Sequence, residues 1–135
     1  MSGDSSAHFL RKIGELLLQS SESSSDILMY TRAATGMVSI SIFKDFGTYI
    51  SYQDDLGILA DTVLDFWEDQ PPGRQWDEME YTIRNGKFEA NFIYSDQIDP
   101  QDDGLDRRDR AVARVFGSKT IVYPSWDDVG DVFKL

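Results

Sequence analysis

Charged side chains crowd one stretch of the sequence, YSDQIDPQDDGLDRRDR, which spans residues 94 to 110. Six aspartates and three arginines surround a single glycine there. Side chains of these types can ligate calcium, form a charged surface for a partner, or cap a helix. The spacing of the carboxylates can be used to test the first of these possibilities, calcium binding.

A calcium-binding loop of the helix–loop–helix type needs oxygen ligands at alternate positions, a glycine at the sixth position and a bidentate glutamate at the twelfth. Counting from Asp99 places Asp103 at the fifth position and Gly104 at the sixth, as the pattern requires. The twelfth position is Arg110, a cation where the bidentate carboxylate must stand. The residues before the loop also have the alternation of a strand rather than of an entering helix. We therefore expect no metal ion in this loop and no other cofactor.

Catalytic groups are scarce in the sequence. His8 is the only histidine, and no residue at a fixed spacing offers it a partner for acid–base chemistry. The lack of cysteine excludes thiol nucleophiles and cysteine-ligated metals. Neighbouring carboxylates such as Asp102 and Asp103 would share a proton only in a cleft, and nothing in the sequence indicates one. We interpret the chain as a protein without enzymatic activity.

Three segments have the periodicity of helices that would position these groups. The first covers about residues 6 to 20, and the second ends at Gln70, before Pro-Pro-Gly. The third covers about residues 104 to 116, with Asp103 as its N-cap and Gly117 just after its end. The acidic stretch thus leads into a helix, and Asp103 has a capping role beside any other.

Strands fill the intervals between these helices. β-Branched and aromatic residues predict three strands at about residues 27 to 33, 37 to 44 and 48 to 52. Asn85-Gly86, between two alternating runs, predicts a two-residue hairpin with both turn residues at positive φ. The predicted fold class is α+β: an antiparallel sheet of about five strands with three helices, in the order α-β-β-β-α-β-β-α, and then a short C-terminal strand or coil. We expect residues 1–135 to form a single domain.

The hairpin turn also predicts which residues face one another, because paired residue numbers must sum to 171. One face then carries the apolar pairs, which are Met79 with Phe92, Tyr81 with Ala90 and Ile83 with Phe88. The other face carries the polar pairs, which are Glu80 with Asn91 and Thr82 with Glu89. We expect this polar face to contact water or a partner.

The third helix has an apolar stripe that a cation interrupts. The predicted inward residues are Leu105, Val112, Val115 and Phe116. Arg108 points into the middle of this stripe, and burying it unpaired would cost several kcal/mol. We interpret Arg108 as part of a structural ion pair with an acid of the preceding loop or hairpin, such as Asp96; alternatively, it holds the acidic loop in shape for a partner. The predicted solvated arginines are Arg107, Arg110 and Arg114.

The net charge of −11 is concentrated in the middle of the chain. Residues 1–52 carry −1, residues 53–110 carry −10 and residues 111–135 carry 0. A field of this sign repels nucleic acid and anionic membranes and attracts basic partners, although acidic surfaces also serve solubility. No apolar run approaches the roughly 20 residues of a membrane span, and the N-terminus lacks the core of a signal peptide. We expect a soluble cytoplasmic protein that binds neither nucleic acid nor membrane.

The order of the elements in the second half of the chain carries a resemblance. A strand, a tight turn with Gly-Lys-Phe, a strand ending in Tyr-Ser-Asp, an acidic loop and an arginine-bearing helix follow one another. The matching residues are Trp76, Gly86-Lys87-Phe88, Phe92 to Tyr94, Asp96, Arg107-Arg108 and Phe116-Gly117. In these features the chain resembles, over about residues 6 to 120, the YezG-like immunity proteins, which are antitoxins of bacterial polymorphic-toxin and contact-dependent growth-inhibition systems.

The resemblance implies a cytoplasmic α+β protein without catalytic activity that binds and blocks the toxic domain of its cognate effector, in many cases a nuclease. An acidic protein suits such a role, since nucleases carry basic substrate surfaces. The predicted partner-binding residues are Asp96, Asp99, Asp102, Asp103 and Asp106, with Glu68 and Asp69 behind them. The alternative is a generic acidic interaction module, or a nucleic-acid mimic, without a dedicated toxin. The oligomeric state is open.

Overall fold

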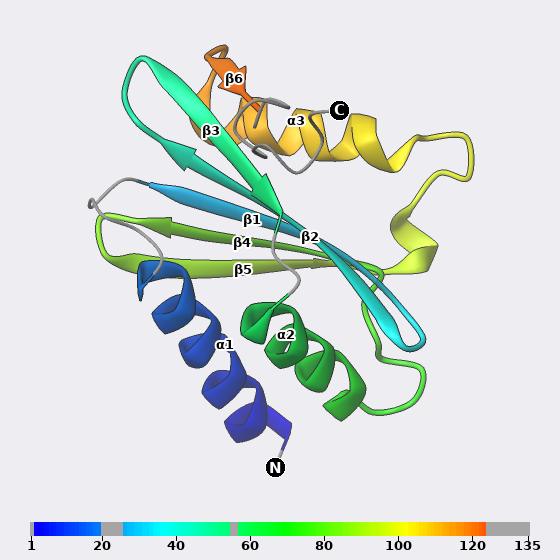
Figure 1. The fold of residues 1–135 in the computed structure, drawn as a ribbon. Helices are drawn as coiled ribbons and strands as arrows, with labels where there is room; N and C mark the ends of the chain where they lie inside the picture. Colours follow the sequence, from blue (N-terminus) through cyan, green and yellow to red (C-terminus); the bar gives the residue numbers. More distant parts are fainter. Residues whose placement is uncertain (1, 20–25, 55–56, 124–135) are drawn as a thin grey trace, which may run out of the picture.

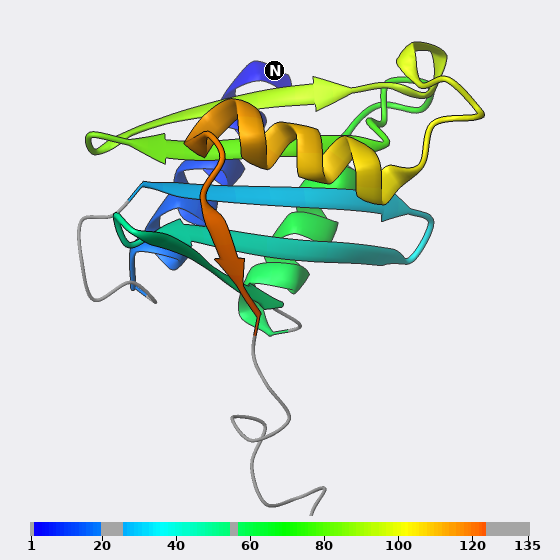
Figure 2. The same ribbon diagram turned by 90° about the horizontal axis from the view of Figure 1, so that it is seen from above.

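The structure is a computed structural model, and the residues that it describes are 2–19, 26–54 and 57–123. In this part of the chain, a single mixed sheet of six strands lies between helices (Figures 1 and 2). α1 (Ser2–Gln19) and α2 (Ile58–Asp69) cover one face of the sheet. α3 (Gly104–Phe116) covers the other face.

The strands follow the order β5-β4-β1-β2-β3-β6 across the sheet. They are β1 (Ile27–Ala34), β2 (Met37–Asp45), β3 (Tyr49–Asp54), β4 (Glu78–Arg84), β5 (Lys87–Ile93) and β6 (Thr120–Val122). β1 to β3 form an antiparallel meander, and the β4–β5 hairpin pairs with β1. The α+β class and the order of elements are confirmed. The short C-terminal strand is the sixth strand, and its parallel pairing with β3 makes the sheet mixed rather than antiparallel.

The predicted hairpin is confirmed in its turn and its register. Asn85 and Gly86 have φ angles of 53° and 76°, the left-handed conformation that a two-residue turn of this type requires. The paired residues run from Glu78 with Ile93 to Arg84 with Lys87. The side chains of alternate residues on β4 and β5 therefore fall on the faces that the sequence predicted.

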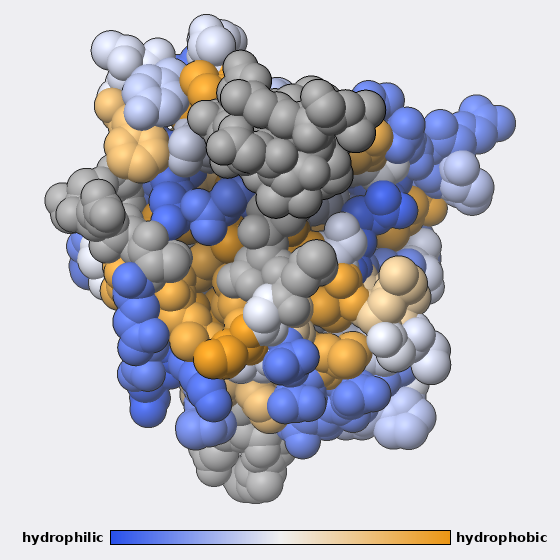
Figure 3. Space-filling view, in the orientation of Figure 1, coloured by the Kyte–Doolittle hydropathy of each residue, from blue (hydrophilic) through white to orange (hydrophobic). Residues whose placement is uncertain are grey.

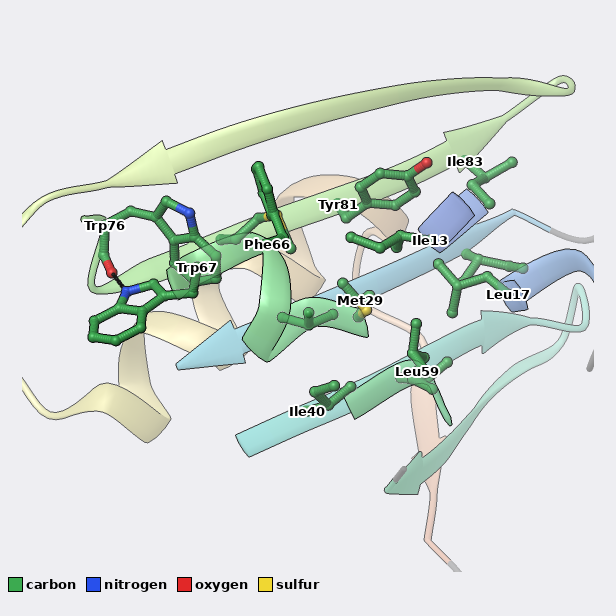
Figure 4. Packing of buried hydrophobic residues seen from close by; sticks show 14 residues of the cluster. Ile13, Leu17, Met29, Ile40, Leu59, Phe66, Trp67, Trp76, Tyr81 and Ile83 are labelled. Atoms are coloured by element: carbon green, nitrogen blue, oxygen red, sulfur yellow. Dashed lines mark hydrogen bonds between the residues drawn. The ribbon is translucent and has the colours of Figure 1, made fainter. Parts of the chain in front are cut away.

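The larger hydrophobic core lies between the sheet and the helices α1 and α2 (Figure 4). Its fully buried members include Ile13, Leu17, Met29, Val63, Phe66, Trp76 and Tyr81. Each such side chain contributes roughly 1.5–3 kcal/mol through its removal from water. Two polar side chains in this layer bind backbone oxygens: Trp67 Nε1 donates to the Trp76 carbonyl at 2.7 Å, and the Tyr81 hydroxyl donates to the Leu10 carbonyl at 2.6 Å.

The second core lies on the other face, beneath α3. Its buried residues are Leu28, Tyr30, Phe43, Ile50, Ala111, Val112 and Phe116. Because α3 packs here, Glu78 and Glu80 on β4 are buried instead of facing water. The prediction of a solvated or partner-binding polar face is therefore wrong for Glu80, although Thr82 is partly exposed and Glu89 and Asn91 on β5 are exposed.

The ends of the helices match the predictions unevenly. α3 has the predicted bounds, the Asp103 side chain accepts a hydrogen bond from Leu105 N at 2.9 Å, and Gly117 has φ 80°. α1 begins at Ser2, earlier than predicted, and its predicted end at residue 20 lies outside the described residues. Over the described part of the chain, no helix has both the length and the apolar character that a membrane span needs.

Candidate functional site

A buried carboxylate on β4 joins α3 to the sheet. Glu78 is 2% exposed, and Arg107 Nε donates to its two oxygens at 3.0 and 3.1 Å while Nη2 donates to Oε2 at 2.5 Å. The Tyr30 hydroxyl on β1 donates to the same carboxylate, and Arg32 Nε lies 3.8 Å from Oε2. We call these four residues, Glu78, Tyr30, Arg32 and Arg107, the Glu78 cluster. β1, β4 and α3 meet at this charged centre.

The electrostatics of the Glu78 cluster favour the charged pair. Burial acts to raise the pKa of Glu78, but the hydrogen bonds from Arg107 and Tyr30 outweigh burial and hold the pKa below the usual value of a glutamate. The hydrogen bond to Glu78 raises the pKa of Arg107. Burial, and then the contact with the Glu78 carboxylate, raise the pKa of Tyr30, so that its hydroxyl remains a donor. This arrangement is that of a structural ion pair.

The Glu78 cluster also fixes the start of α3 and the loop before it. Arg107 Nη1 donates to the Asp102 carbonyl at 2.7 Å. The Arg32 guanidinium lies so close to Gly104 that a Cβ added there would be 2.7 Å from Arg32 Cζ. A cavity of about 430 Å³ adjoins the cluster; its lining residues are Arg32, Ala33, Ala34, Met37, Ser39, Asp77, Glu78, Ile98 and Arg107. The C-terminal end of the loop that precedes α3 is therefore attached to the sheet.

We call residues 95–103 the acidic loop. It begins with a 3₁₀ helix, η1 (Ser95–Gln97), in which Asp96 is exposed. Asp99 is also exposed, and its Oδ1 accepts a hydrogen bond from Gln101 N at 2.9 Å, which closes a local turn. The carboxylates of Asp96 and Asp99 thus lie where a partner can reach them, and one of them also shapes the loop.

The last two acids of the acidic loop have structural partners. Asp102 is half-buried, and its carboxylate forms an ion pair with Arg110 of α3 at 2.5 Å. Asp103 caps α3, as predicted. Within the described residues, no group of three or more histidine or acidic side chains is placed to hold a metal ion.

The predicted contact residues form two groups on opposite faces of the sheet. Asp106 lies exposed in the first turn of α3, beside the acidic loop. Glu68 and Asp69 lie exposed at the C-terminal end of α2, on the other face. The connection after α2 and the acidic loop both lie at the end of the sheet where β4 begins and β5 ends (Figures 1 and 2). A partner that contacts both groups must therefore reach around this end of the sheet.

α2 carries two further acids that the sequence reasoning did not select, Asp61 and Asp65. With Asp69 they recur every four residues, and Glu68 is adjacent, so the exposed side of α2 holds four carboxylates. The ion pairs found among the described residues involve none of the four. We call these residues the α2 acidic stripe (Asp61, Asp65, Glu68 and Asp69). The four-residue spacing was the signal in the sequence that could have identified it.

Three acids of the α2 acidic stripe, Asp65, Glu68 and Asp69, lie where they oppose the stability of their own helix, whereas Asp61 lies in the first turn, where the helix dipole favours it. Like charges four residues apart repel one another, and acids in the last turn lie at the negative end of the helix dipole. No basic residue occurs in the sequence between Lys44 and Arg74 to compensate them. Figure 3 shows hydrophilic residues over the outer side of α2 and over the acidic loop.

Arg108 does not have the predicted partner. Its guanidinium lies over the rings of Phe43 and Tyr52, 5.6 and 5.3 Å from their centroids, and Nη1 donates to Ser41 Oγ at 3.3 Å. Among the described residues, the one carboxylate within 4 Å is that of its exposed neighbour Asp109, at 3.7 Å. The predicted pairing of Arg108 with an acid of the preceding loop or hairpin, such as Asp96, is therefore wrong, because aromatic rings lie beneath this position.

Arg107 takes the buried ion pair that was predicted for Arg108. Arg114 is exposed, as predicted, although it also donates to Glu80 on β4. Leu105, predicted to face inward, is 52% exposed. These corrections have one cause: α3 lies on a sheet face that presents two carboxylates of β4, so arginines rather than leucine occupy part of its contact side.

No protein-family model matches the sequence, and the curated proteins include no significant match to it.

Proposed function

We propose that the protein is a cytoplasmic immunity protein, an antitoxin that binds a cognate bacterial toxin domain and blocks it without catalysis. The toxin domain is a nuclease with a basic surface. One observation carries the proposal: the α2 acidic stripe places four exposed carboxylates on one helix, three of them (Asp65, Glu68 and Asp69) where they reduce its stability, and none of the four forms an ion pair with another described residue. Charges in such positions favour a role in binding.

The acidic loop is the second part of the proposed interface. Its C-terminal end is held by Arg107 and by the cap of α3, so this part of the loop has its conformation before a partner arrives. A preordered loop loses less conformational entropy on binding. The excess negative charge accelerates association with a basic domain and makes it sensitive to salt.

The partnership is tested by co-purification with the product of the adjacent gene. We expect a complex with a basic domain whose nuclease activity is lost when this protein is bound and returns when it is removed. Capture of many unrelated basic proteins, with no toxin encoded beside this gene, would instead favour the generic acidic module or nucleic-acid mimic.

The interface is tested by matched neutralisation. Glu68→Gln with Asp69→Asn removes two carboxylates of the α2 acidic stripe, and Asp96→Asn with Asp106→Asn removes two from the acidic loop and α3. Thr48→Lys with Ser118→Lys makes the same change in net charge at exposed residues elsewhere. We expect the first two variants to lower the association rate about tenfold at low salt and to flatten its salt dependence. Equal rates in all three variants would remove both acidic groups from the interface.

A further inference from the structure

β5 is an outer strand of the sheet, with β4 on one side and no described strand on the other. Figure 2 shows it along the upper edge of the sheet. The opposite outer strand, β6, has three residues, and short outer strands are one of the ways in which proteins prevent edge pairing. β5 has seven residues without a proline, in continuous register with β4. An outer strand of this length can pair with another strand.

The register of the hairpin decides which backbone groups of β5 point outward. In a two-residue hairpin, the residues next to the turn exchange both backbone hydrogen bonds, and so does every second pair after them. Arg84 and Lys87 are the pair next to the turn. The residues of β5 whose N–H and C=O groups point away from the sheet are therefore Phe88, Ala90 and Phe92.

A second copy of β5 meets these groups in one well-matched register. Two antiparallel copies related by a two-fold axis at Ala90 overlap over all seven residues and place Phe88 opposite Phe92. Glu89 then lies opposite Asn91, so that no charge directly faces a like charge. An axis at Glu89 would instead set two glutamates directly against each other, which is unfavourable. Full overlap of the seven residues and the pairing of charges thus favour the axis at Ala90 over the axis at Glu89.

The surroundings of β5 leave room for an added strand on both faces. Phe88 stacks on Tyr81, with 5.4 Å between ring centroids, and is still 47% exposed. A recess of about 160 Å³ beside α1 is lined in part by Leu18 and Phe88. On the α3 side, a recess of about 290 Å³ is lined by polar residues that include Arg84 and Glu89. An added strand with apolar residues on one side and charged residues on the other fits both recesses, and β5 itself has this alternation.

We propose that β5 is a dimerisation edge, at which two copies of this chain join their sheets through antiparallel β5 strands. The dimer differs from toxin binding in its response to salt. Two protomers that each carry a net charge of −11 repel each other, and salt screens this repulsion. The dimer is therefore stabilised as ionic strength rises, whereas a complex with a basic partner is weakened.

Sedimentation equilibrium of the full chain tests the proposal. We expect a particle of twice the 15.4 kDa chain mass, with a dissociation constant that falls as salt is added. Phe88→Lys removes both phenylalanine pairs across the axis and raises the dissociation constant about tenfold. Ala90→Pro removes the two outward N–H groups at the axis and leaves the pairing with β4, which does not use them. This variant is expected to be a monomer.

Ile58→Lys is the matched control. It also replaces an exposed apolar residue, 68% exposed, with lysine and makes the same change in charge, but it lies at the start of α2. We expect it to leave the dissociation constant unchanged. Circular dichroism identifies any variant that does not fold. If one of Ala90→Pro and Phe88→Lys does not fold, the other still tests the dimer. A wild-type chain that is monomeric at all concentrations and salt levels overturns the proposal. The proposal is also overturned if Phe88→Lys and Ala90→Pro both fold and both still form the dimer.

Discussion

The Glu78 cluster and the α2 acidic stripe are both built from carboxylates, but they differ in what surrounds them. Glu78 is buried and accepts hydrogen bonds from Arg107 and Tyr30. The carboxylates of the α2 acidic stripe are exposed and lie in a helix without a basic residue. Every carboxylate in the two groups contributes equally to the net charge of the chain, but the two groups differ in burial and in ion pairing. The first group holds the fold together, and the second is available to a partner.

The buried pair is best understood as a device that specifies where α3 docks. Taking two charges out of water is costly, and their attraction does little more than offset that cost. A misplaced α3, however, would leave Glu78 buried without its cation, which is far more costly. The Glu78 cluster therefore excludes alternative placements of α3, and with it of the acidic loop that Arg107 holds.

Glu78→Ala is expected to produce the largest loss of stability. It leaves the Arg107 guanidinium partly buried without its carboxylate and the Tyr30 hydroxyl without its acceptor. Breaking a buried pair in this way costs about 3–5 kcal/mol. Urea unfolding followed by circular dichroism measures the change.

A double variant separates the pair itself from the cost of leaving one charge alone. Glu78→Met with Arg107→Met fills the site with apolar side chains and removes both charges. We expect this variant to recover much of the stability that Glu78→Ala loses. Equal losses in the two variants would mean that the packing of these side chains, rather than their charges, stabilises the docking of α3.

The pH dependence of stability provides a second and smaller effect. The pKa of Glu78 in the folded protein lies below its usual value of 4.5, so the unfolded chain takes up this proton at a higher pH than the folded one. The stabilisation is complete above the usual value and is lost as the pH falls through the folded pKa. The stability difference between wild type and Glu78→Gln should therefore narrow from neutral pH to about pH 3. A difference that stays constant over this range would contradict the assignment of a charged Glu78.

The elements of this fold could be predicted from the sequence because each has a local signal. Asn85-Gly86 determined the register of the β4–β5 hairpin, and Asp103 and Gly117 marked the ends of α3. Such signals depend on turn geometry and on caps, which involve residues close together in the chain. Signals of this kind can be recognised from a short stretch of sequence, without knowledge of the tertiary structure.

The roles of Arg107 and Arg108 could not be predicted in the same way. Helical periodicity predicted Arg108 on the inward side of α3 and Arg107 on the solvated side, whereas in the structure both contact the sheet and the residues beneath them decide their roles. Glu78 lies beneath Arg107, and the rings of Phe43 and Tyr52 lie beneath Arg108. Which strands lie under α3 follows from the strand order of the whole sheet, and no local pattern in the sequence encodes that order.

Among the predicted contact residues, Asp103 and Asp96 should differ in how much stability their replacement by alanine costs. Asp103→Ala removes the N-cap of α3 and is expected to cost about 1 kcal/mol of stability. Asp96→Ala changes an exposed residue of η1 and should shift stability by less than about 0.5 kcal/mol. Chemical unfolding of the two variants measures the contrast. Equal losses would show that the acidic loop depends on Asp96 for its shape, and Asp96 could then no longer be tested as a pure contact residue.

Substitutions in the α2 acidic stripe are expected to give the smallest change in the free energy of unfolding. Whether this change is a gain or a loss is the informative result. Asp69→Lys places a cation in the last turn of α2 and four residues after Asp65, where both the helix dipole and the acid favour it. We expect a gain of a few tenths of a kcal/mol, which high salt should diminish. Asp69→Asn is the control that removes the repulsion without adding the attraction, and its gain should be smaller. Thermal unfolding at two salt concentrations measures both. A loss of stability in either variant would mean that the folded chain itself uses the Asp69 carboxylate, and the contrast with the Glu78 cluster would then not hold at this end of α2.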